Sequence, residues 1–344
     1  MNKRVGLIII GVVIIFLGIF LWSRHNFNKS ETKDNKLTAQ QLPSINGILV
    51  DSTIAGKRPI AVVIENHPDS RPQSGLEDAD IIYEAPTEAG ITRFLALFQT
   101  KEPPNIGPIR SARIYFNQIA NQWGGVYAHV GGNSDALAAI RTEAYPNLSN
   151  ADQFFNADYF HRTSERPAPH NVYTSLEKLR ELIVHSHYSE TANYQPWPYK
   201  DTATIGLPPA EDIKLNFSTP SYLVRYLYNK NTNTYLRYLA GKPVLDAETG
   251  EQLTARNIIV QFAESSLTQT DTVGSIAFNL NTEGKADFFL DGEIIEGTWK
   301  NVLGTIHYYD SSGKVLNLNR GVTWVELVPS ALSQNLRWSA NNAK

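Results

Sequence analysis

Apolar residues are distributed unevenly along the chain, and their spacing predicts three kinds of segment. Residues 5–22 (VGLIIIGVVIIFLGIFLW) form an uncharged run that is long enough to cross a bilayer as a helix. Residues 23–41 are polar and charged, which is typical of a flexible tether. We therefore expect a stub at 1–4, a transmembrane signal-anchor at 5–22 and a tether at 23–41, followed by folded domains.

From residue 42 to residue 190 the pattern alternates between short apolar runs and helical spacing. The apolar runs predict buried strands at residues 59–64, 80–84, 92–98 and 125–130. Helical spacing predicts helices at 111–123 and 134–141, and Thr174-Ser-Leu-Glu177 has the form of a capping box that opens a third. This pattern favours an α/β domain, with a mixed sheet and flanking helices.

The second half of the chain has a different pattern. Residues 191–213 are rich in Pro, Gly and Thr, which predicts a linker. Between 214 and 331, short runs with strand-like composition alternate with turn signals, and Asp291-Gly292 is placed as the turn of a two-residue hairpin. We expect a mostly β domain over 214–331 and a tail at 332–344.

Composition and charge narrow the function classes. The chain has no cysteine, so disulfides, thiolate metal sites and a cysteine nucleophile are excluded. A net charge of −3 and a pI of about 6.3 give no general attraction for nucleic acid. Positive residues flank the apolar run on both sides, so charge alone leaves its orientation open. A short N-terminal anchor usually serves export, and we expect a single-pass cell-membrane protein with most of the chain extracytoplasmic.

The stretch Asn105-Ile-Gly-Pro-Ile-Arg-Ser-Ala-Arg113 is the strongest candidate for ligand binding. It places Arg110, Ser111 and Arg113 behind a Gly-Pro turn and at the start of a predicted helix. The first N–H groups of a helix are unpaired and carry partial positive charge, so arginines beside them suit phosphate, pyrophosphate or carboxylate. The spacing of Arg110 and Arg113 places both on one helix face. The alternative is a pair of surface arginines bound to glutamates.

Two further groups of residues carry polar chemistry. Arg93 lies in an apolar strand, where it needs an acid or an anion as partner, and Glu84 or Glu88 could fill that role. The segment 161–171 (HRTSERPAPHN) is a non-helical loop in which polar groups gather, and a loop of this composition is more often a site than a scaffold. Its candidates for ligand binding or catalysis are Arg162, Arg166, His170 and Asn171.

Metal ions could be held in two ways. Asp80 stands at a strand start near arginines, and a carboxylate there suits Mg²⁺ when a phosphate shares the metal, although such an aspartate is often only a cap. A zinc site is the second option, because zinc accepts imidazole nitrogen. Its candidate ligands are His67, His129, His161 and His170.

Several motifs together resemble the YerB-like lipoproteins, bacterial envelope proteins built from paired N- and C-terminal domains. In the first domain these are RPIAVVIENH (58–67), ADIIYE (79–84), GITRF (90–94), IGPIRSAR (106–113) and APHN (168–171). In the second they are YLR (235–237), NIIVQ (257–261) and GTW (297–299). The resemblance implies a surface-exposed bacterial protein and no particular activity. Relatives are often tethered through a lipidated cysteine, which this chain lacks.

A weaker similarity concerns the first domain alone. The order VVIEN (62–66), DADII (78–82), IRSAR (109–113) and VYAHVGG (126–132) is similar to the LytR–CpsA–Psr phosphotransferases, which move polymers from polyprenyl-pyrophosphate carriers to the cell wall. The similarity implies that Asp80 binds a metal and Arg110 a pyrophosphate. Ser111 stands where that family has an aspartate.

Three functions follow from these observations, and the third, metal-dependent hydrolysis, requires the histidines to converge within coordination distance. In the first, the N-terminal domain binds an anionic envelope ligand. If it is an enzyme, Arg93, Arg110 and Arg113 neutralise phosphate, Asp80 holds Mg²⁺, and His129 or His170 moves a proton. In the second, the protein is a non-catalytic scaffold that binds cell-wall proteins or glycan. Convergence of the arginines on one cleft would favour the first, and pairing of each arginine with an acid would favour the second.

Overall fold

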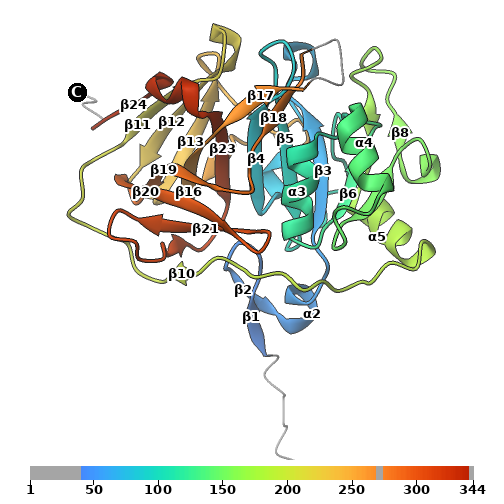
Figure 1. Cartoon of the computed structure of the whole chain (residues 1–344), viewed down its shortest axis with the longest axis horizontal. Helices are drawn as coiled ribbons and strands as arrows, with labels where there is room; N and C mark the ends of the chain where they lie inside the picture. The colour runs from blue at the N-terminus through green and yellow to red at the C-terminus, as the bar shows by residue number, and fades with distance from the viewer. Residues whose placement is uncertain (1–39, 269–273, 341–344) are drawn as a thin grey trace, which may run out of the picture. The chain divides into compact units, whose positions relative to one another are not determined.

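The computed structural model describes residues 40–268 and 274–340, and the compact unit begins at Gln41. It is a two-domain, mostly β structure with few helices (Figure 1). Within the described ranges, no helix is long and apolar enough to cross a membrane. The predicted anchor at 5–22 and nearly all of the predicted tether lie outside the described residues.

One ten-stranded sheet runs through both domains, in the order β21-β20-β19-β16-β23-β4-β5-β3-β6-β7. Its N-terminal strands are β3 (Ile60–Glu65), β4 (Ile81–Pro86), β5 (Thr92–Phe98), β6 (Val126–His129) and β7 (Ser149–Asp152). Its C-terminal strands are β16 (Asn257–Ala263), β19 (Glu283–Leu290), β20 (Glu293–Val302), β21 (Thr305–Asp310) and β23 (Thr323–Pro329).

The two halves of this sheet meet at a parallel pair. Strand β23 lies beside β4, and Glu326 is the register partner of Glu84. The last long strand of the chain therefore completes the sheet that the N-terminal domain begins. The segments β3, β4 and β5 are buried along their whole length, as their continuous apolar runs predict.

Three helices and a second sheet cover the two faces of this long sheet. Helices α3 (Ile114–Gln122) and α4 (Ser134–Arg141) belong to one face, where α3 packs on Ala61 and Val63, and Figure 1 shows them in front of β3 and β6. Helix α5 (Leu176–His185) packs on the opposite face, against Ile60 and Val62. Alternate residues of β3 thus face two separate hydrophobic cores.

A six-stranded antiparallel sheet packs on the C-terminal part of the second face. Its strands are β11 (Asp212–Asn216), β12 (Leu223–Asn229), β13 (Thr234–Leu239), β14 (Lys242–Pro243), β15 (Thr254–Ala255) and β24 (Leu336–Ser339). The remaining short elements are β1 (Gln41–Pro43), β2 (Leu49–Asp51), α2 (Ser52–Ala55), β8 (His161–Arg162), β9 (Val172–Tyr173), β10 (Tyr199–Lys200), β17 (Ser265–Leu267), β18 (Ile276–Phe278) and β22 (Leu318–Asn319).

A buried ionic cluster joins the two sheets. Arg237 of β13 is fully buried and lies between Glu84 of β4 and Glu326 of β23, with ion pairs to both carboxylates. Tyr226 of β12 donates a hydrogen bond to Glu326. Two carboxylates that face each other across a parallel pair would repel, and the guanidinium between them offsets this.

One local prediction from the sequence is confirmed and one is corrected. Asp291 and Gly292 have the positive φ angles of 59° and 81° that a two-residue hairpin turn requires. The capping serine of α5 is Ser175, one residue later than the predicted capping box starts. Within the predicted linker at 191–213, Trp197 is buried and donates a hydrogen bond to Ile306 O.

Candidate functional site

The polar residues of the candidate site gather where β3 ends. Buried Glu65 is the last residue of the strand, and His67 precedes a short 3₁₀ helix, η1 (Pro68–Ser70). Proline at the first position sets the turn, and His67 caps it by accepting a hydrogen bond at Nδ1 from Asp69 N (3.2 Å). The turn after β3 thus brings the imidazole of His67 and the carboxylate of Asp69 close together.

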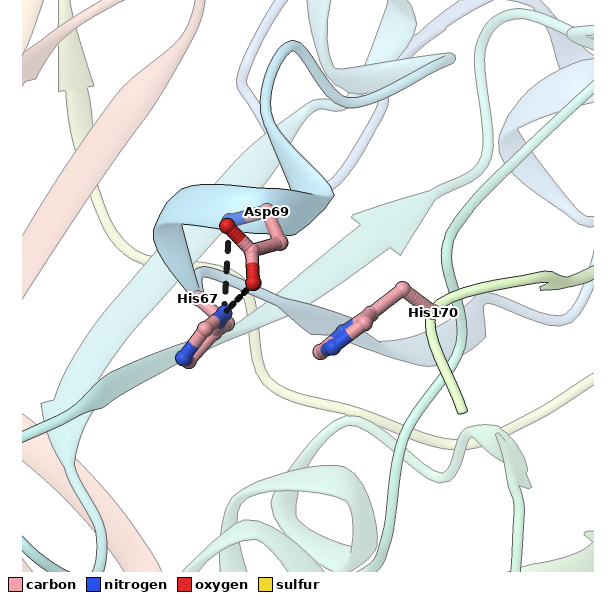
Figure 2. Close-up of side chains that lie close together, drawn as sticks. All are labelled: His67, Asp69 and His170. Carbon is pink, nitrogen blue, oxygen red and sulfur yellow. Dashed lines mark hydrogen bonds and ion pairs between the residues drawn. The ribbon is translucent and has the colours of Figure 1, made fainter. Parts of the chain in front are cut away.

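His170 completes this group from a distant part of the sequence. Its ring stacks on the ring of His67, with centroids 5.0 Å apart and an interplanar angle of 19°. One ligand atom each from His67, Asp69 and His170 lies within 4.8 Å of the other two (Figure 2). Asp69 Oδ2 is 3.6 Å from His67 Nδ1. These three residues, called the His67 cluster below, bring together two imidazoles and one carboxylate.

Glu65 lies behind the cluster and fixes the orientation of His170. The distance from Glu65 Oε2 to His170 Nδ1 is 2.8 Å, and Glu65 Oε1 forms an ion pair with Arg110 Nε at 3.0 Å. Because a carboxylate only accepts, His170 Nδ1 donates in this contact, which leaves Nε2 outside it. The side chain of Glu65 is only 4 % exposed, so Arg110 supplies the charge that a buried carboxylate needs.

The loop that carries His170 is fastened over the end of β3. Arg166 donates to the backbone oxygens of Ser70 and Pro72, the latter at 2.6 Å. Arg162 Nη1 donates to Asn171 Oδ1 at 2.8 Å. Arg166 therefore ties the loop to η1, while Arg162 stays at the exposed rim.

Gly107 allows the loop to approach this closely. A Cβ atom at this position would lie 2.6 Å from Tyr173 Cδ1 and 2.9 Å from Val172 O. The backbone of Ile109 also donates to Val172 O. The glycine of the Gly-Pro turn thus lets the stretch before Arg110 pack closely against the end of the 161–171 loop.

Arg93 and Arg113 belong to a second cluster. Both form ion pairs with Glu88, and the Arg93 Nη2 to Glu88 Oε1 distance is 2.6 Å. Burial alone would raise the pKa of Glu88, but the two guanidinium charges outweigh burial and lower the pKa to about 2. Burial, followed by the charge of Arg113, lowers the pKa of Arg93 to about 10. Both arginines also donate to Ser111 O.

The prediction that Arg110 and Arg113 share one helix face is wrong. Helix α3 begins at Ile114, and Arg113 is its extended N-cap residue, with no side-chain cap. Arg110 N donates to Val63 O, and Ala112 N donates to Gly131 O, so this stretch bridges β3 and the Gly131-Gly132 turn. Arg110 therefore turns toward Glu65, whereas Arg113 turns toward Glu88.

Asp80, His129 and His161 are not part of the His67 cluster, and His161 lies exposed in β8. Asp80 is buried and accepts four hydrogen bonds, from Asn46 Nδ2, Gln99 N, Thr100 N and Thr100 Oγ1. Burial raises its pKa, although the bonds from Thr100 and Gln99 oppose this. His129 is fully buried between Gly131 O and Asn150 Oδ1, and burial lowers its pKa.

An apolar cavity adjoins η1 on the side of the second domain. Its volume is about 500 Å³, and its lining combines prolines and aliphatic residues with two cations. The lining residues used below are Pro68, Arg71, Leu239, Lys242 and Val244. Helix η1 contributes Pro68 to this cavity and Asp69 to the His67 cluster, so it belongs to both.

Sequence reasoning overlooked Asp69, the role of Glu65 and this cavity. His67 and His170 were among the candidate zinc ligands, and an aspartate two residues after His67 was the available signal for a third ligand. The cavity gave no such signal, because its two sides come from different domains.

Comparisons with known proteins agree with this architecture. Residues 45–189 match the family model described as "Protein of unknown function (DUF3048) N-terminal domain", and residues 213–325 match its C-terminal domain. The chain is 32 % identical over 295 residues to the "Putative lipoprotein YerB" of Bacillus subtilis, covering 85 % of this chain and 88 % of the relative.

The crystal structure of the YerB protein from Bacillus subtilis has the same fold. It superposes with a TM-score of 0.77 at 31 % identity, and the match covers 87 % of this chain and 99 % of that one. Two matched domains, a relative matched over most of its length and a shared fold agree, and the chain belongs to the YerB-like family of paired DUF3048 domains.

Proposed function

We propose that this protein is a membrane-anchored, extracytoplasmic envelope protein that binds an anionic amphipathic ligand, with a lipid-linked pyrophosphate as the leading candidate. The printed name of the relative, a putative lipoprotein, supports the envelope location. The uncharged run at 5–22 would supply the anchor in place of a lipidated cysteine.

The observation that carries the proposal is the position of η1 between a polar rim and an apolar cavity. On the polar side lie Arg110, with a side chain that is 24 % exposed, the exposed Arg162 and His170. On the apolar side is the cavity of about 500 Å³ that Leu239 and Val244 line. A ligand with a phosphate head and a hydrocarbon tail matches both surfaces. Ser111 and Asn171 lie beside these rim residues in sequence.

A binding measurement tests this proposal. The full chain in detergent micelles would be titrated with polyprenyl-pyrophosphate and, separately, with inorganic pyrophosphate, each with and without Mg²⁺. We expect both ligands to bind and Arg162→Gln to weaken both. Arg141→Gln changes an exposed arginine on α4 and is the matched control.

The cavity has its own test. Val244→Trp would fill part of it and should weaken binding of polyprenyl-pyrophosphate while leaving inorganic pyrophosphate unaffected. If neither ligand binds the wild-type chain, the proposal fails. Enhancement of binding by Mg²⁺ would support a metal-assisted site.

A second candidate function rests on the pairing of the arginines. Arg93 and Arg113 share Glu88, and Arg110 is paired with Glu65, so these cations have acidic partners within the protein. Such pairing suits a non-catalytic scaffold that binds cell-wall proteins or glycan. Crosslinking of the full chain in the bacterial envelope would favour this function if one cell-wall enzyme is recovered with the wild type and with Arg162→Gln alike.

A further inference from the structure

We propose that His67, Asp69 and His170 bind one divalent transition-metal ion, with zinc as its best-matched example, and that Glu65 positions His170 for this role. His170 belongs to both sites, but this inference does not rest on the pyrophosphate proposal, because the metal ligands are imidazole and carboxylate groups and metal binding needs no phosphate.

The geometry of the His67 cluster is close to that of a zinc site. The ligand atoms lie within 4.8 Å of one another, whereas two ligands of a tetrahedral zinc ion are roughly 3.3 Å apart. Movements of the two more exposed side chains that add up to about 1.5 Å close this difference. Asp69 is 71 % exposed and His67 is 33 % exposed, so both have room to move, while His170 is 14 % exposed and is held by Glu65.

The contact between Glu65 and His170 is the strongest sign that an imidazole is prepared for a metal. Metal-binding histidines usually donate their second ring N–H to a carboxylate or carbonyl oxygen, which fixes the tautomer and increases basicity at the other nitrogen. Glu65 Oε2 holds His170 Nδ1 in this way at 2.8 Å, and Nε2 is left as the ligand. Arg110 balances the charge on Glu65. Glu65 can therefore orient the metal ligand His170 without binding the metal itself.

The donor set indicates which ion fits. Two imidazole nitrogens and one carboxylate oxygen suit zinc and its neighbours among the divalent transition metals, whereas Mg²⁺ and Ca²⁺ prefer oxygen ligands throughout. Three protein ligands leave a fourth position of a tetrahedral ion open. Asp69 is exposed, so this position faces solvent and can exchange its ligand.

Metal uptake by the full chain in detergent tests the inference directly. The protein would be stripped with a chelator, dialysed against zinc and analysed by elemental mass spectrometry and by calorimetric titration. We expect one zinc ion per chain, and loss of uptake in His67→Ala and in Asp69→Asn. Glu65→Gln should keep the stoichiometry and weaken affinity by about 10- to 100-fold, because only the positioning contact changes.

Matched variants separate a site from adventitious binding. His307→Ala removes a histidine from the C-terminal domain and should bind zinc as the wild type does. Asp69→Asn changes an exposed side chain by one atom, so it tests the site even if the histidine variants fold poorly. Cobalt substitution adds a second readout, since a tetrahedral site with two imidazoles gives strong visible absorption that His67→Ala should abolish. Zinc uptake that is absent from the wild type, or equal in the wild type and Asp69→Asn, would overturn the inference.

Discussion

Glu84 and Glu326 face each other across the parallel pair β4–β23, and Arg237 of the second sheet lies between their carboxylates. The contact joins residues of both domains, and all three side chains are buried. One guanidinium balances one carboxylate, so the second carboxylate is the costly member of the group. Burial raises the pKa of Glu326 to about 8, which places its proton uptake near neutral pH.

The first prediction concerns the pH dependence of folding. Because the pKa of Glu326 rises from its ordinary value of 4.5 to about 8 on folding, the folded state binds more protons between these values. This group therefore stabilises the fold at low pH, and its contribution is lost as the pH rises to about 8. Glu326→Gln should flatten the stability profile between about pH 5 and pH 8. Urea denaturation at several pH values measures this.

Glu143→Gln is the control for this prediction, since it removes an exposed carboxylate and should keep the wild-type profile. A Glu326→Gln profile that is as steep as that of the wild type would show that another group sets the pH dependence.

The second prediction concerns the cluster formed by Arg93, Glu88 and Arg113. Glu88→Gln leaves two largely buried guanidinium groups without a counter-charge, and we expect a loss of about 3–5 kcal/mol in the free energy of unfolding. Chemical denaturation measures this loss, again with Glu143→Gln as control. A loss below about 1 kcal/mol would mean that the ion pairs of Glu88 with Arg93 and Arg113 stabilise the fold no more than a surface ion pair does.

The third prediction links Gly107 to the His67 cluster. Gly107→Ala would press a methyl group against Tyr173 and Val172 O, and we expect destabilisation of about 1–3 kcal/mol. Because the 161–171 loop ends at this contact, His170 should shift and zinc affinity should fall as well. Gly56→Ala is the comparison, since a Cβ there would meet Ser52 O at 3.2 Å as its one non-adjacent neighbour within 4 Å among residues 40–268 and 274–340. If both variants bind zinc with equal affinity, the packing of the 161–171 loop at Gly107 does not influence the His67 cluster.

The fourth prediction follows from linkage between metal binding and folding. Zinc at 100 times its dissociation constant should stabilise the wild-type chain by about 2.7 kcal/mol. The same zinc concentration should leave His67→Ala unchanged, because the variant lacks a ligand. Thermal denaturation with and without zinc measures this effect, and equal stabilisation of both proteins would place the metal elsewhere.

The local elements of the fold could be predicted from sequence with good accuracy. Strand β3 and helix α4 lie where the apolar runs and helical spacing place them, because each is decided by its own side chains. Helix α3 starts three residues later than predicted, because Ala112 and Arg110 give their backbone N–H groups to neighbouring strands and turns. Tertiary hydrogen bonding therefore overrode the helical spacing at that end.

The candidate site could be predicted only in its parts. Arg93 required an acidic partner, and Glu88 was one of two candidates that the sequence offered. The pairing of Arg110 with Glu65 and the stacking of His67 on His170 depend on how a distant loop folds over the end of β3. Local patterns carry no information on such contacts, because the partners are far apart along the chain.

The pairing of β23 with β4 also has a consequence for how the protein is made. In the sheet β4 lies between β5 and β23, so β23 pairs the edge of β4 that faces away from β5. Strand β23 ends at Pro329, close to the C-terminus of the chain. At typical rates of synthesis, on the order of 5–20 residues per second, the edge of β4 stays open for tens of seconds after it is made. An apolar, unpaired edge invites pairing with other chains, so the nascent N-terminal domain should depend on chaperones until β23 emerges.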